Sequence, residues 1–453
     1  MRRAPFARRL AALLAAALLA AFGLGGCQGS KGQETSAPPE KASSGIATKL
    51  SGPVEITFWH AMTGKHEEAL RTIAENFTKE HPDIRIKLEA QGNYGDLQQK
   101  LTAAAKSHTL PVMAQVIETW VTDFRQNGLV ADLTPYIENP EIGWNKQELD
   151  DIVEVFRKAN QWDGKYYSLP FSKSTQILYY NTDYFQELGL QPPKTWDELK
   201  EAAKKLTGEK NGRRVIGMGF ENSVGWQFHQ WVKQAGGRYV DEATGEVLFD
   251  SPEGREALGF LVGLFQEEVA RLAGEDQYVS NPFGRGDVGM YIGSSAGIPF
   301  VAKAAEGNIH WAAAPVPAGE EKAVAFAGNA VAVFDSAKPE EKLAAWLFIK
   351  YLLNTDNTVF WAKSTGYLPI RYSALETKEW QDYVAQNPAY GVGTRQFDYG
   401  FFDPRIPGFD AALKEIDKEI QAALLGQKSA DAALRDAARA AQAAIDRAKE
   451  RAK

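Results

Sequence analysis

The stretch VEITFW, residues 54–59, opens the part of the chain that decides the fold. Its apolar and polar residues alternate, which predicts a β-strand with one buried face. Apolar residues at helical spacing follow over residues 66–80, and alternation returns in IRIKL, residues 84–88. A second helix is predicted over 96–105, and VMAQVI, residues 112–117, has the composition of a buried strand. Strands and helices in this order predict a parallel sheet covered by helices, and hence an α/β fold.

The same alternation of strands and helices continues toward the C-terminus. Further strands are predicted over residues 176–180, 215–220, 288–292 and 331–334, and helices over 195–206, 253–269, 339–354 and 429–453. The helix over 195–206 begins with Thr195 and Glu198 at the spacing of a capping box, in which each side chain accepts a backbone N–H of the other residue. No internal repeat is present in the sequence.

The first 26 residues have the features of a lipoprotein signal peptide. Four arginines precede a thirteen-residue run of mostly Ala and Leu, residues 10–22, which is too short for a permanent bilayer span. The following Leu-Gly-Gly-Cys resembles a bacterial lipobox, which predicts that Cys27 is lipidated and becomes the new N-terminus. An ordinary secretory signal beside an incidental cysteine is the alternative. Residues 27–52 are polar and predict a disordered tether between this anchor and the folded part.

Composition and charge narrow the function further. The chain has 453 residues, about right for two lobes, and a net charge of −7 that becomes −11 when residues 1–26 are removed. No cluster of basic residues is present, so we expect no nucleic-acid partner. Cys27 is the only cysteine, so neither an internal disulfide nor a thiolate metal site is possible. The six histidines show no zinc-type spacing, and we expect no metal and no cofactor.

Several short segments together resemble one family. In chain order they are Phe58-Trp59-His60, Gly92-Asn93-Tyr94, Gln115-Val116-Ile117-Glu118, residues 169–175 (LPFSKST), Leu178-Tyr179-Tyr180-Asn181, residues 192–196 (PPKTW), Ser294-Ser295, residues 365–370 (TGYLPI) and Thr394-Arg395-Gln396. They resemble the sn-glycerol-3-phosphate-binding proteins of bacterial ABC importers, a branch of the extracytoplasmic solute-binding family that includes the maltose-binding proteins. The resemblance extends over about residues 54–445.

This resemblance implies a two-lobed periplasmic-binding-protein clamshell of class II, with the ligand cleft between the lobes. The implied limits are 53–171 and 329–366 for lobe 1, and 172–328 and 367–453 for lobe 2. The chain would cross between the lobes three times, near residues 169–174, 327–329 and 366–368. A ligand would bind between the lobes and favour the closed state by contacts made only there.

The resemblance also implies a set of ligand contacts. The matching positions are Tyr94, Glu118, Ser174, Ser294, Gly328 and Tyr367, and Trp226 lies near the tryptophans that line the family's cleft. A carboxylate such as that of Glu118 accepts hydrogen bonds from a diol, and tyrosines offer a ring and a hydroxyl. The two serines are expected at strand ends beside helix starts, where free N–H groups favour anions. A surface acid, core tyrosines and turn residues remain the alternatives for these positions.

One departure concerns the phosphate. Members of the glycerol-phosphate branch carry an arginine on the final cleft helix, whereas residues 403–410 (DPRIPGFD) are shorter here and have no arginine in register. Arg405 is close enough to substitute, because a guanidinium holds phosphate with two hydrogen bonds. If Arg405 is directed elsewhere, a glycerophosphodiester or a neutral sugar fits better than a phosphate monoester.

Three functions stay open at this point. The first is an extracytoplasmic substrate-binding lipoprotein of an ABC importer for sn-glycerol-3-phosphate or a glycerophosphodiester. The second has the same role for a mono- or oligosaccharide, which the eleven tryptophans suit equally well. The third is an enzyme or a sensory protein on this fold; no acid–base or nucleophile constellation supports catalysis, so we expect no enzyme. The expected partners are permease subunits with their ATPase, and the expected state is a monomer.

Overall fold

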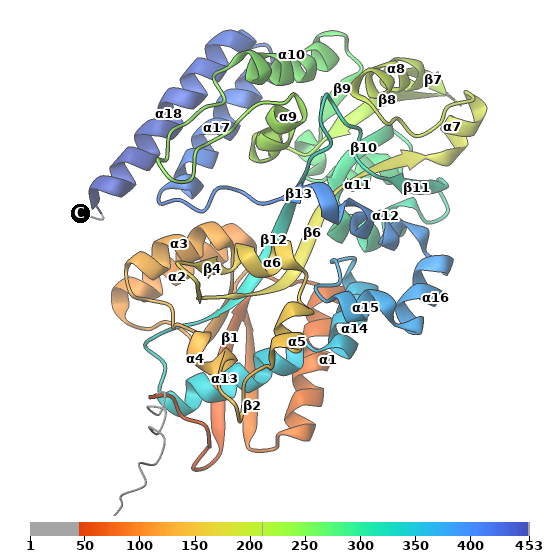
Figure 1. The fold of residues 1–453 in the computed structure, drawn as a ribbon. Helices are drawn as coiled ribbons and strands as arrows, with labels where there is room; N and C mark the ends of the chain where they lie inside the picture. The colour runs from red at the N-terminus through yellow and green to blue at the C-terminus, as the bar shows by residue number, and fades with distance from the viewer. Residues whose placement is uncertain (1–44, 211, 452–453) are drawn as a thin grey trace, which may run out of the picture. The chain divides into compact units, whose positions relative to one another are not determined.

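The computed structural model describes residues 45–210 and 212–451, and its first sheet follows the predicted order. Strands β1 (Val54–His60), β2 (Ile84–Ala90) and β3 (Met113–Val116) lie parallel, with β1 between the other two. Helices α1 (Lys65–Glu80) and α2 (Tyr94–Ser107) connect them (Figure 1). The parallel α/β arrangement predicted for this region is confirmed.

Two long strands extend this sheet and carry the chain into a second α/β region. Strand β6 (Leu169–Asn181) pairs with β12 (Val324–Val333) over its first half and with β10 (Val288–Ser294) over its second half. Strand β12 in turn pairs with β3, so one hydrogen-bonded network of strands runs through both regions. Figure 1 shows β6 and β12 side by side between the two groups of helices.

Three passages of the chain are hydrogen-bonded to one another at Lys173. Its backbone pairs with Gly328 of β12 and with Leu368 in an isolated bridge. Gly328 has φ 99°, and a Cβ there would lie 1.9 Å from the Ser172 carbonyl oxygen, so only glycine fits. These passages are the three expected crossings, although the lobe limits themselves remain a prediction.

Each region has its own hydrophobic core. The first core gathers β1, α1 and α13 (Pro339–Leu352) around the fully buried Trp346. The second gathers β8 (Arg213–Phe220) and the helices α8 (Trp196–Leu206), α10 (Pro252–Gln266), α17 (Phe409–Leu424) and α18 (Ala430–Arg451). The remaining helices are α3 (Glu118–Gln126), α4 (Thr134–Ile137), α5 (Lys146–Asp150), α6 (Glu154–Ala159), α7 (Thr182–Glu187), α9 (Phe228–Gln234), α11 (Ser280–Gly284), α12 (Ile298–Ala305), α14 (Thr355–Thr365), α15 (Tyr372–Glu376) and α16 (Lys378–Gln386).

Short elements complete the chain. The small strands are β4 (Gln161–Trp162), β5 (Lys165–Tyr166), β7 (Gly208–Lys210), β9 (Ala270–Leu272), β11 (Trp311–Ala314) and β13 (Gly400–Phe401), and the 3₁₀ turns are η1 (Val224–Gln227), η2 (Gly274–Asp276), η3 (Ser295–Gly297), η4 (Pro388–Gly391) and η5 (Gly393–Tyr399). Helices α15 and α16 pack against α14, which itself packs against α1 of the first region.

Two details differ from the sequence predictions. The helix predicted over 253–269 ends at Gln266, because Ala270 already pairs with β8 as the start of β9. The capping box at α8 is only half formed: the Thr195 side chain accepts the Glu198 N–H at 3.2 Å, but the Glu198 carboxylate accepts the Lys194 N–H instead.

The predicted signal peptide, Cys27 and most of the tether lie outside the described residues. Within the described residues, no helix is both long enough and apolar enough to span a bilayer. The same residues contain no group of three potential metal-ligating side chains.

Candidate ligand-binding site

Two of the predicted site residues touch each other. Tyr94 begins α2, and its hydroxyl oxygen lies 3.3 Å from that of Tyr367. Asn329, which follows Gly328 in β12, donates from its amide to the Tyr94 hydroxyl at 2.7 Å. Burial raises the pKa of both tyrosines, so both stay neutral. Two predicted residues, Tyr94 and Tyr367, therefore meet beside the crossing point of the chain, together with the unpredicted Asn329.

Glu118 and Lys173 form a buried ion pair next to this cluster. Glu118 begins α3 with 5% exposure, Lys173 is fully buried, and the ammonium bonds the carboxylate Oε1. The Asn160 amide donates to the same oxygen at 3.2 Å, and Asn160 is held in turn by Ser168. Burial lowers the pKa of Lys173, against the opposing effect of Glu118. One carboxylate oxygen of Glu118, Oε1, therefore already accepts hydrogen bonds from Lys173 and Asn160 in the absence of a ligand.

The two serines occupy different settings. Ser294 ends β10, and its hydroxyl accepts the Ala296 N–H at 3.2 Å at the start of η3, as expected for a serine at a strand end. Ser174 was expected in the same setting, and this prediction is wrong. It lies buried inside β6, opposite Ala327, because β6 does not end between the two regions. The next residue, Thr175, donates its N–H to Ser295 at 3.3 Å, so the two segments still meet.

Arg405 and Trp226 lie away from this group. Arg405 donates from Nη1 to the carbonyl oxygens of Lys158, Ala159 and Gln161, at 2.9, 3.1 and 2.7 Å. Trp226 lies in η1, packed against the second hydrophobic core. The Arg405 guanidinium is thus hydrogen-bonded to the main chain of the first region.

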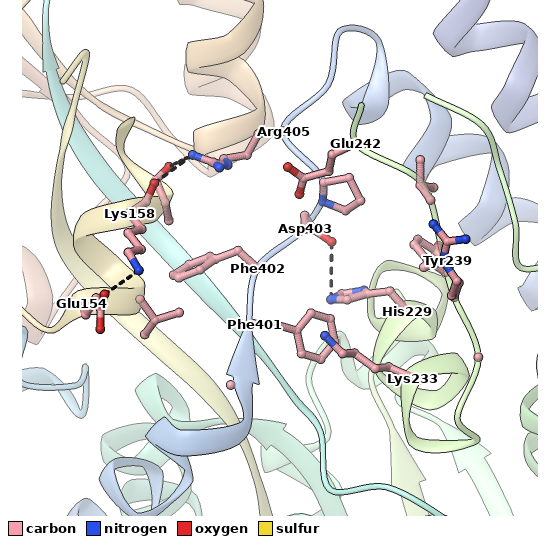
Figure 2. Close-up of a pocket in the computed structure, with 17 residues that line it drawn as sticks. Glu154, Lys158, His229, Lys233, Tyr239, Glu242, Phe401, Phe402, Asp403 and Arg405 are labelled. Atoms are coloured by element: carbon pink, nitrogen blue, oxygen red, sulfur yellow. Dashed lines mark hydrogen bonds and ion pairs between the residues drawn. The ribbon is translucent and has the colours of Figure 1, made fainter. Parts of the chain in front are cut away.

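A cavity of about 600 Å³ opens beside Arg405. It is bounded by α6, by α9, by residues 237–242 and by the segment 400–405 (Figure 2). Arg405 is the only predicted site residue on its wall. This cavity is a candidate space for a ligand, whereas the side chains of Tyr94 and Tyr367 are in contact with each other.

His229 and Asp403 are neighbours on the wall of this cavity, and their side chains point toward each other (Figure 2). His229 Nε2 lies 3.4 Å from Asp403 Oδ1, yet neither atom has a hydrogen-bond partner among the described residues. Burial, and then the charges of Glu118 and Asp410, raise the pKa of Asp403 to about 7. Burial lowers the pKa of His229 to about 4, so this ring is neutral at physiological pH. Buried polar atoms without partners indicate positions that a ligand can satisfy.

The segment that follows Asp403 also links the two regions. Asp410, at the start of α17, accepts from the Gln98 amide at 3.0 Å and from the Trp120 indole at 3.3 Å. Gln98 lies on α2 and Trp120 on α3, so a helix of the second region is bonded to two helices of the first. These contacts lie beside the predicted cleft residue Glu118.

Four residues of the site were not predicted from the sequence: Lys173, His229, Asn329 and Asp403. The signal for Lys173 is a single charge within the otherwise uncharged run of residues 169–181. Asn329 follows a glycine already assigned to the site. His229 and Asp403 are far apart in the chain, and nothing in either local sequence indicates that they meet.

Two α/β regions, joined by three crossings with the candidate site beside them, define a class II periplasmic binding protein. The chain belongs to the bacterial extracellular solute-binding protein family, whose family model matches residues 72–389. Its members are substrate-binding proteins of transport systems, not enzymes; they bind small ligands outside the cytoplasm and deliver them to ABC permeases.

Three comparisons illustrate the range of ligands. The chain is 27% identical over 404 residues to the sn-glycerol-3-phosphate-binding periplasmic protein UgpB of Yersinia pseudotuberculosis, covering 84% of this chain and 90% of that one. A cyclic α-maltosyl-1,6-maltose-binding protein of Arthrobacter globiformis is 28% identical, with a TM-score of 0.74 and coverage of 87% and 100%. UgpB of Mycobacterium tuberculosis, solved with glycerophosphocholine, is 23% identical with a TM-score of 0.75 and coverage of 88% and 99%, and shows the shared fold.

Proposed function

We propose that this chain is the lipid-anchored receptor of an ABC importer and captures a small solute that carries several hydroxyl groups. The single observation that supports it best is the cavity beside the interlobe crossings, whose wall includes His229 and Asp403 with buried polar atoms that lack a hydrogen-bond partner. Its volume of about 600 Å³ lies within the range of roughly 300–1,000 Å³ typical of small-molecule sites.

The first candidate ligand is a glycerophosphodiester. The Yersinia relative, named for binding sn-glycerol-3-phosphate, supports a ligand with a glycerol group. The contacts of Arg405 disfavour sn-glycerol-3-phosphate itself, because the guanidinium already serves three carbonyl oxygens. A diester carries one negative charge rather than nearly two, so it depends less on a dedicated cation.

The second candidate is a mono- or oligosaccharide in the same transport role. It is supported by the Arthrobacter structure, whose printed ligand is a cyclic maltose derivative. The rings of Phe401, Phe402 and Tyr239 on the cavity wall also suit a sugar.

Titration of the full chain in mild detergent tests these candidates. Calorimetry with sn-glycerol-3-phosphate, glycerophosphocholine and maltose should give binding to one of the last two. It should give little or none to sn-glycerol-3-phosphate, and Arg405→Ala should not change this preference. Binding of sn-glycerol-3-phosphate that disappears in Arg405→Ala would restore the phosphate role of Arg405.

The lipid anchor and the oligomeric state are separate parts of the proposal. Replacing Cys27 by serine should move the protein from the membrane fraction to the soluble extracytoplasmic fraction, since acyl chains on this residue would provide the attachment. An unchanged membrane fraction would contradict the anchor. Light scattering should give the mass of a monomer, and a stable dimer would contradict that state.

A further inference from the structure

The cavity wall presents two unpartnered polar atoms whose chemistry selects a ligand. Both His229 Nε2 and Asp403 Oδ1 are buried without a hydrogen bond, and His229 as a whole is 3% exposed. His229 Nδ1 is likewise without a hydrogen-bond partner among the described residues. In either tautomer, the neutral ring has one nitrogen that can accept a hydrogen bond and one N–H that can donate one.

His229 Nε2 and Asp403 Oδ1 lie 3.4 Å apart without a hydrogen bond. The ionised carboxylate can only accept, and the neutral imidazole can accept through one nitrogen and donate through the other, so ligand hydroxyl groups can satisfy both side chains. We propose that His229 and Asp403 are specificity-determining residues that form hydrogen bonds with ligand hydroxyl groups, so that the cavity takes an uncharged polyhydroxylated ligand. This inference rests on the proposed receptor function and chooses between its candidate ligands.

The cations of the cavity wall are already engaged. Lys158 pairs with Glu154 at 2.5 Å, and Arg238 pairs with Asp241 at 2.8 Å. Lys233 lies 4.1 Å from the centre of the Phe401 ring. Arg405, the fourth, is bonded to main-chain carbonyls. A phosphate would therefore meet no cation that is free of other contacts, and it would lie close to the Asp403 carboxylate.

A cationic ligand fits the wall less well than a hydroxyl-rich one. Four cationic side chains line the cavity against three carboxyl groups, those of Glu154, Glu242 and Asp403, so the wall has a small excess of positive charge that opposes a cationic ligand. Sugar or polyol hydroxyls bring hydrogen-bond donors and acceptors without a net charge.

The test is a calorimetric titration of the full chain with glucose, maltose, maltotriose, glycerol, sn-glycerol-3-phosphate, glycerophosphocholine and choline chloride. The wild type should bind one of the four uncharged compounds more tightly than any of the three charged ones. Asp403→Asn and His229→Ala should each weaken this binding about tenfold or more, the scale of a lost hydrogen bond to a buried charged or polar group.

Asp123→Asn is the matched control. Burial raises the pKa of Asp123 to about 6, but this residue does not line the cavity, so its substitution should leave the affinity unchanged. Circular dichroism and the melting temperature separate lost binding from lost folding. If Asp403→Asn fails to fold, His229→Ala carries the test.

The outcomes separate the two proposals. Tighter binding of sn-glycerol-3-phosphate, glycerophosphocholine or choline would overturn the assignment of an uncharged ligand and leave the receptor function standing. Saccharide binding indifferent to Asp403 and His229 would overturn their role alone. A folded wild type that binds none of the seven compounds would contradict both proposals.

Discussion

The buried pair of Glu118 and Lys173 offers a quantitative test of how the crossing point is held together. Lys173→Met removes the ammonium from a side chain with no solvent exposure, and leaves the Glu118 carboxylate with the Asn160 amide as its remaining donor. Breaking a buried ion pair by removing one partner costs about 3–5 kcal/mol, because the other charge stays buried. Glu118→Gln should also destabilise, since it leaves the ammonium without its anion.

The assay is thermal unfolding at pH 7, followed by circular dichroism. With an unfolding entropy of about 2 cal/mol/K per residue, the roughly 400 residues of the folded part convert this cost into a melting temperature lower by about 4–6 °C. The double variant Lys173→Met/Glu118→Gln carries neither charge and should recover most of the loss. Single variants that melt within about 1 °C of the wild type, or a double variant as unstable as the sum of the two, would refute the reasoning.

Three further predictions concern neighbouring features. Gly328→Ala should destabilise by at least about 3 kcal/mol or prevent folding, because φ is 99° and the Cβ would lie 1.9 Å from the Ser172 carbonyl; a melting temperature like that of the wild type would contradict this. Asp403→Asn should stabilise the protein by about 2 kcal/mol at pH 8 and by much less at pH 4. The fold raises the pKa of Asp403 to about 7, so the contribution of Asp403 to the free energy of unfolding is present at low pH and lost as the pH rises through that value. The shift from 3.8 corresponds to about 4 kcal/mol at most. The 28% exposure of the side chain reduces this figure, because water screens the charge. Equal stabilisation at both pH values would count against a raised pKa. Asp410→Asn should weaken the hydrogen bonds from Gln98 and Trp120 and favour a more open arrangement of the two regions. X-ray scattering without ligand should then give a larger radius of gyration. An unchanged radius would show that these hydrogen bonds do not hold the regions together.

Local pattern was enough to predict the first sheet. Alternation in residues 54–59 and 84–88 reflects strands with one buried face, and the helix over 66–80 buries Leu70, Ile73 and Phe77 on one side. These signals depend only on neighbouring residues, so they survive without knowledge of the tertiary structure. The resemblance to a family then supplied the arrangement of the lobes, which local pattern cannot give.

The central part of the site could not be predicted because its contacts are not local. Residues 172–176 (SKSTQ) are polar and resemble a loop, yet they are buried within β6 because partner strands satisfy their backbone. The side-chain direction of Arg405 depends on carbonyl oxygens near residue 160, and the meeting of His229 with Asp403 depends on the path of segment 400–405. Ser174 was misplaced for the same reason, since its strand continues where an end was expected.

The position of β12 has a consequence for how the chain is made. Strands β3 and β6 are synthesised early, but the strand that lies between them, residues 324–333, emerges from the ribosome about 150 residues after β6 ends. Until then both strands present unpaired edges, which are prone to wrong pairing with other chains. Such long sequence separation slows folding. A fragment that stops before Val324 should therefore aggregate rather than fold as a half-molecule. A chaperone that covers these strand edges would have its largest effect on folding during that interval.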